Sequence, residues 1–198
     1  MATTVYSQKE YHNWYFGDSA GVTFNTPDEE PIYLDGNGSP PNGGSLFNGT
    51  SIISNSEGNL KFYFRNGRFF SSSRELHNVD DIFSNGFEIT SRRNTWQGSV
   101  LLNIEQNKFM MINHTSRDAV YYSIFEEDLE NDSITILKNE RILRNYESDN
   151  LLVIRDFNSN SFFLLLHNKF NNNNRLGEYI LFKFNTDSYE FEEKQRVD

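Results

Sequence analysis

The sequence predicts an all-β, β-propeller-like fold of about four antiparallel four-stranded blades, forming either a closed small ring or a partial propeller. Three observations lead to this prediction. A strand–turn–strand unit recurs about every 50 residues. Side chains that suit a pleated sheet are abundant, with 18 Phe and 10 Tyr. No segment shows the convincing 3.6-residue periodicity of an amphipathic helix.

The N-terminal part predicts three short strands. They are NWYFG at 13–17, AGVTFN at 20–25 and PIYL at 31–34. The stretch DGNGSPPNGG at 35–44 is rich in Gly, Pro and Asn, which is typical of a loop. These strands form the first, smaller unit of the predicted fold.

Three later segments align with one another as repeats. They are SIISNSEGNLKFYF at 51–64, SVLLNIEQNKFMMI at 99–112 and LLVIRDFNSNSFFLLL at 151–166. Each reads as a short apolar strand, a polar turn containing Asn and a longer apolar strand. The repeat spacing lies in the range of propeller blades.

Each repeat continues with two further apolar segments, which predict the third and fourth strands of a blade. Third strands are predicted at 68–70, 120–125 and 178–184, and fourth strands at 86–90, 133–137 and 188–192. In YILFKFN the alternation places Ile180, Phe182 and Phe184 on one face. The chain is therefore interpreted as a single domain, 1–198, with N-terminal strands at 13–34 and units at about 51–90, 99–143 and 151–197.

Repeated blades raise the problem of how the ends of the stack are covered. A blade buries its apolar faces only against its neighbours, so an open arc leaves two ends exposed. The sequence allows a closed four-bladed ring, an arc capped by another chain, or a truncated larger ring. A partial barrel or sandwich of similar strands remains a further alternative.

Charge and composition exclude several classes of partner. The formal net charge is −10, which argues against nucleic acid and against an anionic membrane surface. There are no cysteines, so disulfides, thiolate metal sites and cysteine nucleophiles are excluded. No apolar run approaches the roughly 18–20 residues of a membrane span. The first residues lack the features of a secretory signal peptide, so none is visible in this chain.

No catalytic, cofactor-binding or metal-binding residue is predicted. The four histidines, His12, His77, His114 and His167, show no metal-ligand spacing. His114 and His167 follow equivalent strands and read as hydrogen-bonded strand ends, with a ring of imidazoles as the alternative. The acidic stretch 126–132 lacks the central Gly and terminal Glu of a calcium loop, so a solvated turn is expected there.

One loop contains candidate binding residues. Trp96 lies in the string RRNTWQG beside Arg92 and Arg93. A Trp flanked by Arg is typical of a binding hot spot. The alternative is that Trp96 closes the loop over the edge of a blade.

The strings NWYFGDSAGVTFNT and SIISNSEGNLKFYFRNG carry a family resemblance. With its WYFG…AG…FN motif and propeller-like repeats, the chain resembles a family of surface and secreted proteins from Bacteroidetes, associated with gliding motility and type IX secretion. The resemblance implies a propeller-like fold and an extracellular or cell-surface location. The matching residues are Trp14, Tyr15, Phe16, Gly17, Ala20, Gly21, Phe24, Asn25, Gly58, Asn59, Leu60, Phe62, Tyr63 and Gly67.

Together these observations predict a non-catalytic binding or scaffolding module of a bacterial cell-surface, secretion or gliding-motility assembly. Its partner is expected to be a protein or a larger assembly, with a glycan as a further possibility. The absence of a visible signal peptide favours a second hypothesis, a structural or receptor-binding protein of a bacteriophage virion. A carbohydrate-active propeller enzyme is the third hypothesis, since paired carboxylates can hydrolyse glycosides.

Overall fold

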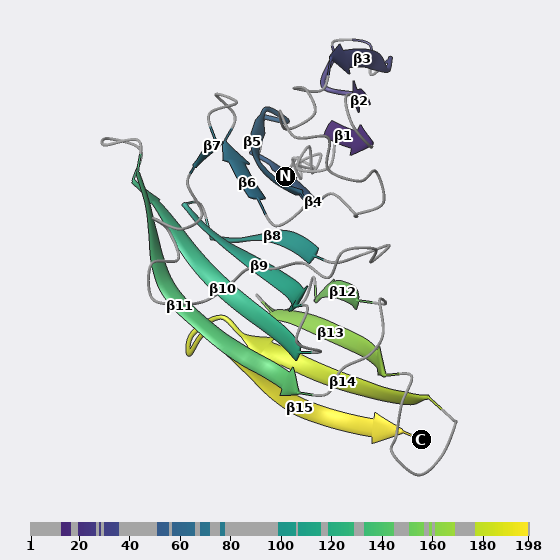
Figure 1. The fold of residues 1–198 in the computed structure, drawn as a ribbon, viewed down its shortest axis with the longest axis vertical. Coiled ribbons are helices and arrows are strands. Elements are labelled where there is room, and N and C mark those ends of the chain that lie inside the picture. Colours follow the sequence, from purple (N-terminus) through teal and green to yellow (C-terminus); the bar gives the residue numbers. More distant parts are fainter. Residues whose placement is uncertain are drawn as a thin grey trace, which may run out of the picture.

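The computed structural model shows a chain built from β-strands alone in its described part. No helix occurs there, and so none that is long and apolar enough to cross a membrane. The strands form four antiparallel sheets, which confirms the predicted all-β class (Figure 1). The described residues are 13–16, 20–26, 28, 30–35, 51–55, 57–65, 68–71, 76–77, 99–105, 107–115, 119–128, 133–144, 151–156, 159, 161–168 and 177–197.

The first sheet contains the three strands predicted near the N-terminus. They pair in the order β1-β2-β3, each antiparallel to the next. Apolar and β-branched residues separated by short connections favour this meander. The strands are β1 (Asn13–Phe16), β2 (Ala20–Thr23) and β3 (Ile32–Asp35).

The second sheet follows the order β4-β5-β6-β7. The segment predicted as its fourth strand, 86–90, lies outside the described residues. Among the described residues, Leu76–His77 is the strand at this edge. Its strands are β4 (Ser51–Ser54), β5 (Leu60–Arg65), β6 (Arg68–Ser71) and β7 (Leu76–His77).

The turn between β4 and β5 is held by the side chain of Asn55. Its Oδ1 accepts hydrogen bonds from the main-chain N–H of Glu57 at 3.1 Å and of Asn59 at 2.8 Å. Gly58 adopts φ 83°, a left-handed conformation that residues with a Cβ rarely tolerate. A Cβ at Gly58 would also lie 2.6 Å from Oδ1 of Asn25 in the connection after β2. This glycine therefore allows both the turn and the close approach of the first sheet.

The third and fourth sheets have the same meander order, β8 to β11 and β12 to β15. Strand β11 extends to Arg144, well past the predicted segment 133–137. The strands are β8 (Ser99–Glu105), β9 (Lys108–Thr115), β10 (Ala119–Asp128), β11 (Ser133–Arg144), β12 (Leu151–Asp156), β13 (Ser161–Asn168), β14 (Glu178–Asn185) and β15 (Glu190–Val197).

The four sheets follow one another as an arc (Figure 1). The first strand of each sheet lies beside the first strand of the next, so that β1 contacts β4, β4 contacts β8 and β8 contacts β12. The first sheet, at the top of Figure 1, and the fourth, at the bottom, lie at opposite ends of this arc. In the part of the chain that the structure describes, no sheet closes on itself.

The third sheet is buried on both faces. In β9 the consecutive residues Phe109, Met110, Met111 and Ile112 are all at most 1% exposed. A strand covered on both faces reads as a continuous apolar run, because neither set of alternating side chains meets water. On one face Phe109 stacks on Phe62 of the second sheet, with ring centroids 4.6 Å apart. Met110 and Ile112 pack on the opposite face, against the fourth sheet.

Among the described residues, the fourth sheet is covered on one face only. Its inner face joins the larger apolar core, in which Ile180, Phe182 and Phe184 are buried, as the alternation in β14 predicts. Tyr179, which precedes Ile180 in the strand, points the other way and is exposed. The other buried members of this sheet are Leu151, Phe162, Leu164 and Leu166.

Candidate functional site

The binding site predicted at Trp96, Arg92 and Arg93 lies outside the described residues. These three positions fall in the interval 78–98, of which the structure describes nothing. That they form a binding site stays a prediction.

The two repeat-equivalent histidines have different surroundings. His114 in β9 is fully buried within the stack. His167 in β13 is half-buried and stacks on Tyr179, with ring centroids 4.6 Å apart. Of the other two, His77 lies in β7 and His12 lies outside the described residues.

Within the described ranges, no group of three or more His, Cys, Asp or Glu side chains could hold a metal ion. Asp128 ends strand β10, whereas Glu130 and Asp132 of the same acidic stretch fall outside those ranges.

The outer face of the fourth sheet carries large apolar side chains that are partly or half exposed. Cross-strand pairing places Leu152, Leu165 and Leu181 in one row on this face, next to a row that contains Ile154 and Phe163. Leu152 and Ile154 are each 50% exposed, although both are large aliphatic side chains. We call this surface the C-terminal end face; it comprises Leu152, Ile154, Phe163, Leu165, Tyr179 and Leu181.

The repeat explains why this face is apolar. His114 and His167 occupy equivalent positions, so Ile112 corresponds to Leu165 and, two residues earlier, Met110 corresponds to Phe163. In the third sheet, Met110 and Ile112 pack against the next sheet along the chain. In the third sheet, these positions contact the fourth sheet. The C-terminal end face carries apolar residues at the equivalent positions of the fourth sheet.

The first sheet has a corresponding face with exposed aromatic side chains. Trp14, Val22 and Tyr33 are cross-strand neighbours and share one face. Trp14 is 51% exposed and Tyr33 is 64% exposed. The ring of Phe24 packs edge-on against the ring of Trp14, with centroids 5.7 Å apart. We call Trp14, Val22, Phe24 and Tyr33 the N-terminal end face.

Asn13 shows that the N-terminal end face points away from the stack. Successive residues of a strand point to opposite faces. The side chain of Asn13 is buried and its Nδ2 donates to Oγ of Ser54 at 2.8 Å and to the carbonyl of Gly58 at 2.7 Å. Because Asn13 faces the second sheet, its neighbour Trp14 faces outward.

Polar contacts fix the sheets to one another between these two end faces. Asn103 of the third sheet donates to the carbonyl of Ser54 in the second at 3.1 Å. Lys61 of the second sheet forms a 2.6 Å ion pair with Glu127 of the third. The first three sheets are therefore held in a defined order by hydrogen bonds and charge as well as by apolar packing.

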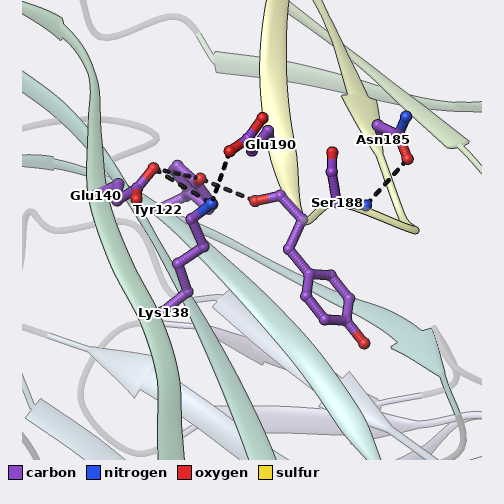
Figure 2. A network of polar contacts seen from close by, with 7 residues as sticks. Tyr122, Lys138, Glu140, Asn185, Ser188 and Glu190 are labelled. Atoms are coloured by element: carbon purple, nitrogen blue, oxygen red, sulfur yellow. Dashed lines mark hydrogen bonds and ion pairs between the residues drawn. The ribbon is translucent and has the colours of Figure 1, made fainter.

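The third and fourth sheets are joined by the network drawn in Figure 2. Nζ of Lys138 in β11 lies 3.4 Å from a carboxylate oxygen of Glu140 and 3.6 Å from one of Glu190, which begins β15. The hydroxyl of Tyr122 lies 2.9 Å from Glu140, and Nζ of Lys138 lies 5.9 Å from the centroid of the Tyr122 ring. Burial of the phenol and the adjacent Glu140 carboxylate raise the pKa of Tyr122 above its ordinary value.

Tyr189 in the β14–β15 turn extends this junction to the turn between β8 and β9. Its hydroxyl donates to Glu105 at 2.9 Å and accepts from Nζ of Lys108 at 2.8 Å. Lys108 also pairs with Glu105 at 2.8 Å. Hydrogen bonds from Lys108 and Tyr189 lower the pKa of Glu105, because they stabilise its charged form.

The turn that carries Tyr189 is organised by Asn185. Its Oδ1 accepts from the main-chain N–H of Asp187 at 2.8 Å and of Ser188 at 3.2 Å (Figure 2). Such Asx turns explain why Asn is favoured at the start of a hairpin connection. Tyr189 follows with φ 55°, a left-handed conformation that is uncommon for a residue with a Cβ.

The sequence matches no protein-family model and no curated protein. The candidate sites therefore rest on the geometry of the described residues.

Sequence reasoning anticipated two exposed ends for an open arc, but it identified neither the residues of the two end faces nor the Tyr189 junction. The C-terminal end face was detectable in principle, because Leu152, Phe163, Leu165 and Leu181 stand at alternate positions opposite the predicted core face. The Tyr189 contacts carry no such signal, because they join segments more than 80 residues apart.

Proposed function

We propose that this chain is a non-catalytic scaffolding module that works within a larger assembly, with its four sheets as the blades of a partial propeller. The observation that carries the proposal is the presence, at each end of one stack, of a sheet face with exposed large apolar side chains. A binding partner covers these faces, and the stack holds the two partners at a fixed separation.

The composition of the end faces supports a binding role. Repeat proteins need terminal repeats with polar outer faces to remain soluble alone. Here the outward residues include Trp14, Tyr33 and Leu152, each at least half-exposed. Aromatic residues are enriched at the cores of protein interfaces, where they supply large contact areas. Covering these side chains stabilises an assembly by removing apolar surface from water.

The cell-surface, secretion or gliding-motility setting of the proposal rests on the sequence resemblance. Residues 13–67 carry the motif similar to that of surface and secreted proteins from Bacteroidetes. The end faces fit this setting, because a surface assembly requires modules that associate through proteins on either side.

Site-specific photo-crosslinking in the native cells tests the proposal. A photoreactive phenylalanine replaces Leu152 or Tyr33, one on each end face. Leu137 in β11 is the matched control, since it is a large apolar side chain of similar exposure, 43%, in the doubly covered third sheet. We expect a defined protein adduct from each end face and a weaker signal from Leu137. Adducts no stronger at the end faces than at Leu137 would overturn the proposal.

A further inference from the structure

Asn113 in β9 is a buried amide on the face of the third sheet that packs against the second, the face that also carries Phe109 and Met111. It is 2% exposed, and its Oδ1 accepts no hydrogen bond from the described part of the chain. A buried carbonyl oxygen without a donor destabilises a fold, so such groups are rare in native proteins. This oxygen therefore indicates a donor that the chain itself does not supply.

Two serine hydroxyls lie beside this amide. Ser99 in β8 is the cross-strand partner of Asn113, so the two side chains share one face, with Cβ atoms about 4.5–5.5 Å apart. Ser51 in β4 of the second sheet donates to the main-chain carbonyl of Ser99, and its Oγ lies 2.7 Å from Oγ of Ser99. Both serines are buried, so the three residues form one polar cluster between two sheets.

Neither serine has a hydrogen left for Asn113. A hydroxyl group carries one hydrogen. Ser51 gives its hydrogen to the carbonyl of Ser99, so the contact between the two hydroxyls uses the hydrogen of Ser99. Oγ of Ser99 keeps lone pairs that can accept. The cluster thus presents two acceptors, Oδ1 of Asn113 and Oγ of Ser99, and it needs a donor beside them.

The repeat shows that this position does not require polar residues. By the alignment of the repeats, Asn113 corresponds to Leu166. Its partner Ser99 corresponds to Leu151, which pairs with Leu166 in the fourth sheet. Leu151 and Leu166 are at most 1% exposed and belong to the larger apolar core. Two leucines fill the position in one sheet, so a serine and an asparagine in the other indicate a polar occupant.

We propose that one buried water molecule occupies this site and joins the second and third sheets. Water carries two hydrogens, which match the two acceptors, Oδ1 of Asn113 and Oγ of Ser99. Buried waters typically make about three hydrogen bonds to polar groups that would otherwise be unsatisfied. The water satisfies Asn113 and links it, through Ser99, to Ser51 of the second sheet. The site lies inside the stack, so it is independent of what covers the end faces.

The donor set fits water rather than a metal ion. All three side chains are neutral, and the described ranges hold no group of three or more His, Cys, Asp or Glu that could bind a metal. Hard cations take six or more oxygen ligands that converge on one point. Here the two hydroxyls hydrogen-bond each other instead of surrounding a shared ion.

Oxygen-17 relaxation dispersion of the full chain tests the site, because it counts long-lived internal waters and does not respond to exchange of hydroxyl hydrogens. Asn113→Leu copies Leu166 of the next repeat and removes the amide. We expect this variant to lose the dispersion amplitude of one water molecule. Asn103→Leu is the matched control, since Asn103 is an amide on the same sheet face that already donates to the Ser54 carbonyl. It should keep the wild-type amplitude, and circular dichroism establishes that both variants retain their strands.

A crystal structure of the wild type gives a second measurement, which does not depend on the folding of a variant. A water oxygen within about 3.2 Å of both Oδ1 of Asn113 and Oγ of Ser99 supports the site. A metal ion at that position overturns it, as does an Asn113 amide that bonds another protein group with no solvent beside it. An unchanged dispersion amplitude in a folded Asn113→Leu protein also overturns it.

Discussion

The hydroxyl of Tyr122 lies 2.9 Å from the main-chain carbonyl of Tyr189 and donates a hydrogen bond to it across the junction of the third and fourth sheets. The same hydroxyl is 2.9 Å from a carboxylate oxygen of Glu140. A phenol has one hydrogen, so the two acceptors share it. One buried tyrosine thus connects its own sheet to the β14–β15 turn of the next.

Replacing Tyr122 with Phe should destabilise the fold by about 1–2 kcal/mol, because the Tyr189 carbonyl and the Glu140 carboxylate lose a buried donor. The aromatic packing with Phe184 and Phe191 should remain, since only the hydroxyl is removed. Urea unfolding of the two proteins measures the difference. Unchanged stability would show that this hydrogen bond does not hold the sheets together.

The raised pKa of Tyr122 predicts a loss of stability in alkaline solution. A neutral phenol is favoured in the folded state, so its stabilising contribution is complete below the ordinary tyrosine pKa of about 10. That contribution is lost as the pH rises above this value. The stability difference between wild type and Tyr122→Phe should therefore shrink in urea titrations from neutral pH to pH 11. A difference independent of pH would contradict the assigned cause.

The lowered pKa of Glu105 predicts a loss of stability in acidic solution. Its carboxylate is stabilised by Lys108 and Tyr189 in the folded state, so its contribution is complete above the unfolded pKa of about 4.5. The contribution disappears as the pH falls through the lower folded value. Glu105→Gln should be less stable than the wild type at neutral pH and equal to it in strong acid. Carboxyl NMR titration of Glu105 checks the direction independently.

Gly58→Ala should destabilise the fold by about 1–2 kcal/mol or more, because φ is positive and the new methyl group would meet Asn25. The two causes can be separated with Asn25→Ala. In that background the clash is absent and only the backbone strain remains, so the loss from Gly58→Ala should be smaller. Equal losses in both backgrounds, measured as a double-mutant cycle, would show that the close approach to Asn25 is irrelevant.

The strand pattern was predictable because burial leaves a direct mark on sequence. The alternation in β14 identifies Ile180, Phe182 and Phe184 as a core face, and the structure confirms it. The uninterrupted run in β9 likewise reflects coverage on both faces. These signals depend only on which side chains meet water, so one sequence suffices to detect them.

The ends of strands at the margins of the sheets could not be located from the apolar pattern of the sequence. Strand β11 continues through Glu140 and Arg141, both exposed, because main-chain pairing with β10 extends beyond the apolar segment. Charged residues on edge strands also limit unwanted pairing, and they obscure the alternation used to recognise a strand. The Tyr189 junction escaped prediction because its geometry exists only after two sheets have packed.

The central claim is that the third sheet is covered on both faces and the fourth on one. Glutamate substitutions at consecutive positions test it most directly: Met110 and Met111 in β9, and Leu164 and Leu165 in β13. Urea unfolding is measured at concentrations low enough to keep the chain monomeric. Burying an unpaired carboxylate destabilises a fold by about 3 kcal/mol or more. We predict such losses at Met110, Met111 and Leu164, and a change within about 1 kcal/mol at Leu165. Equal losses at Leu164 and Leu165 would show that the chain covers its own C-terminal end face, and would contradict the account.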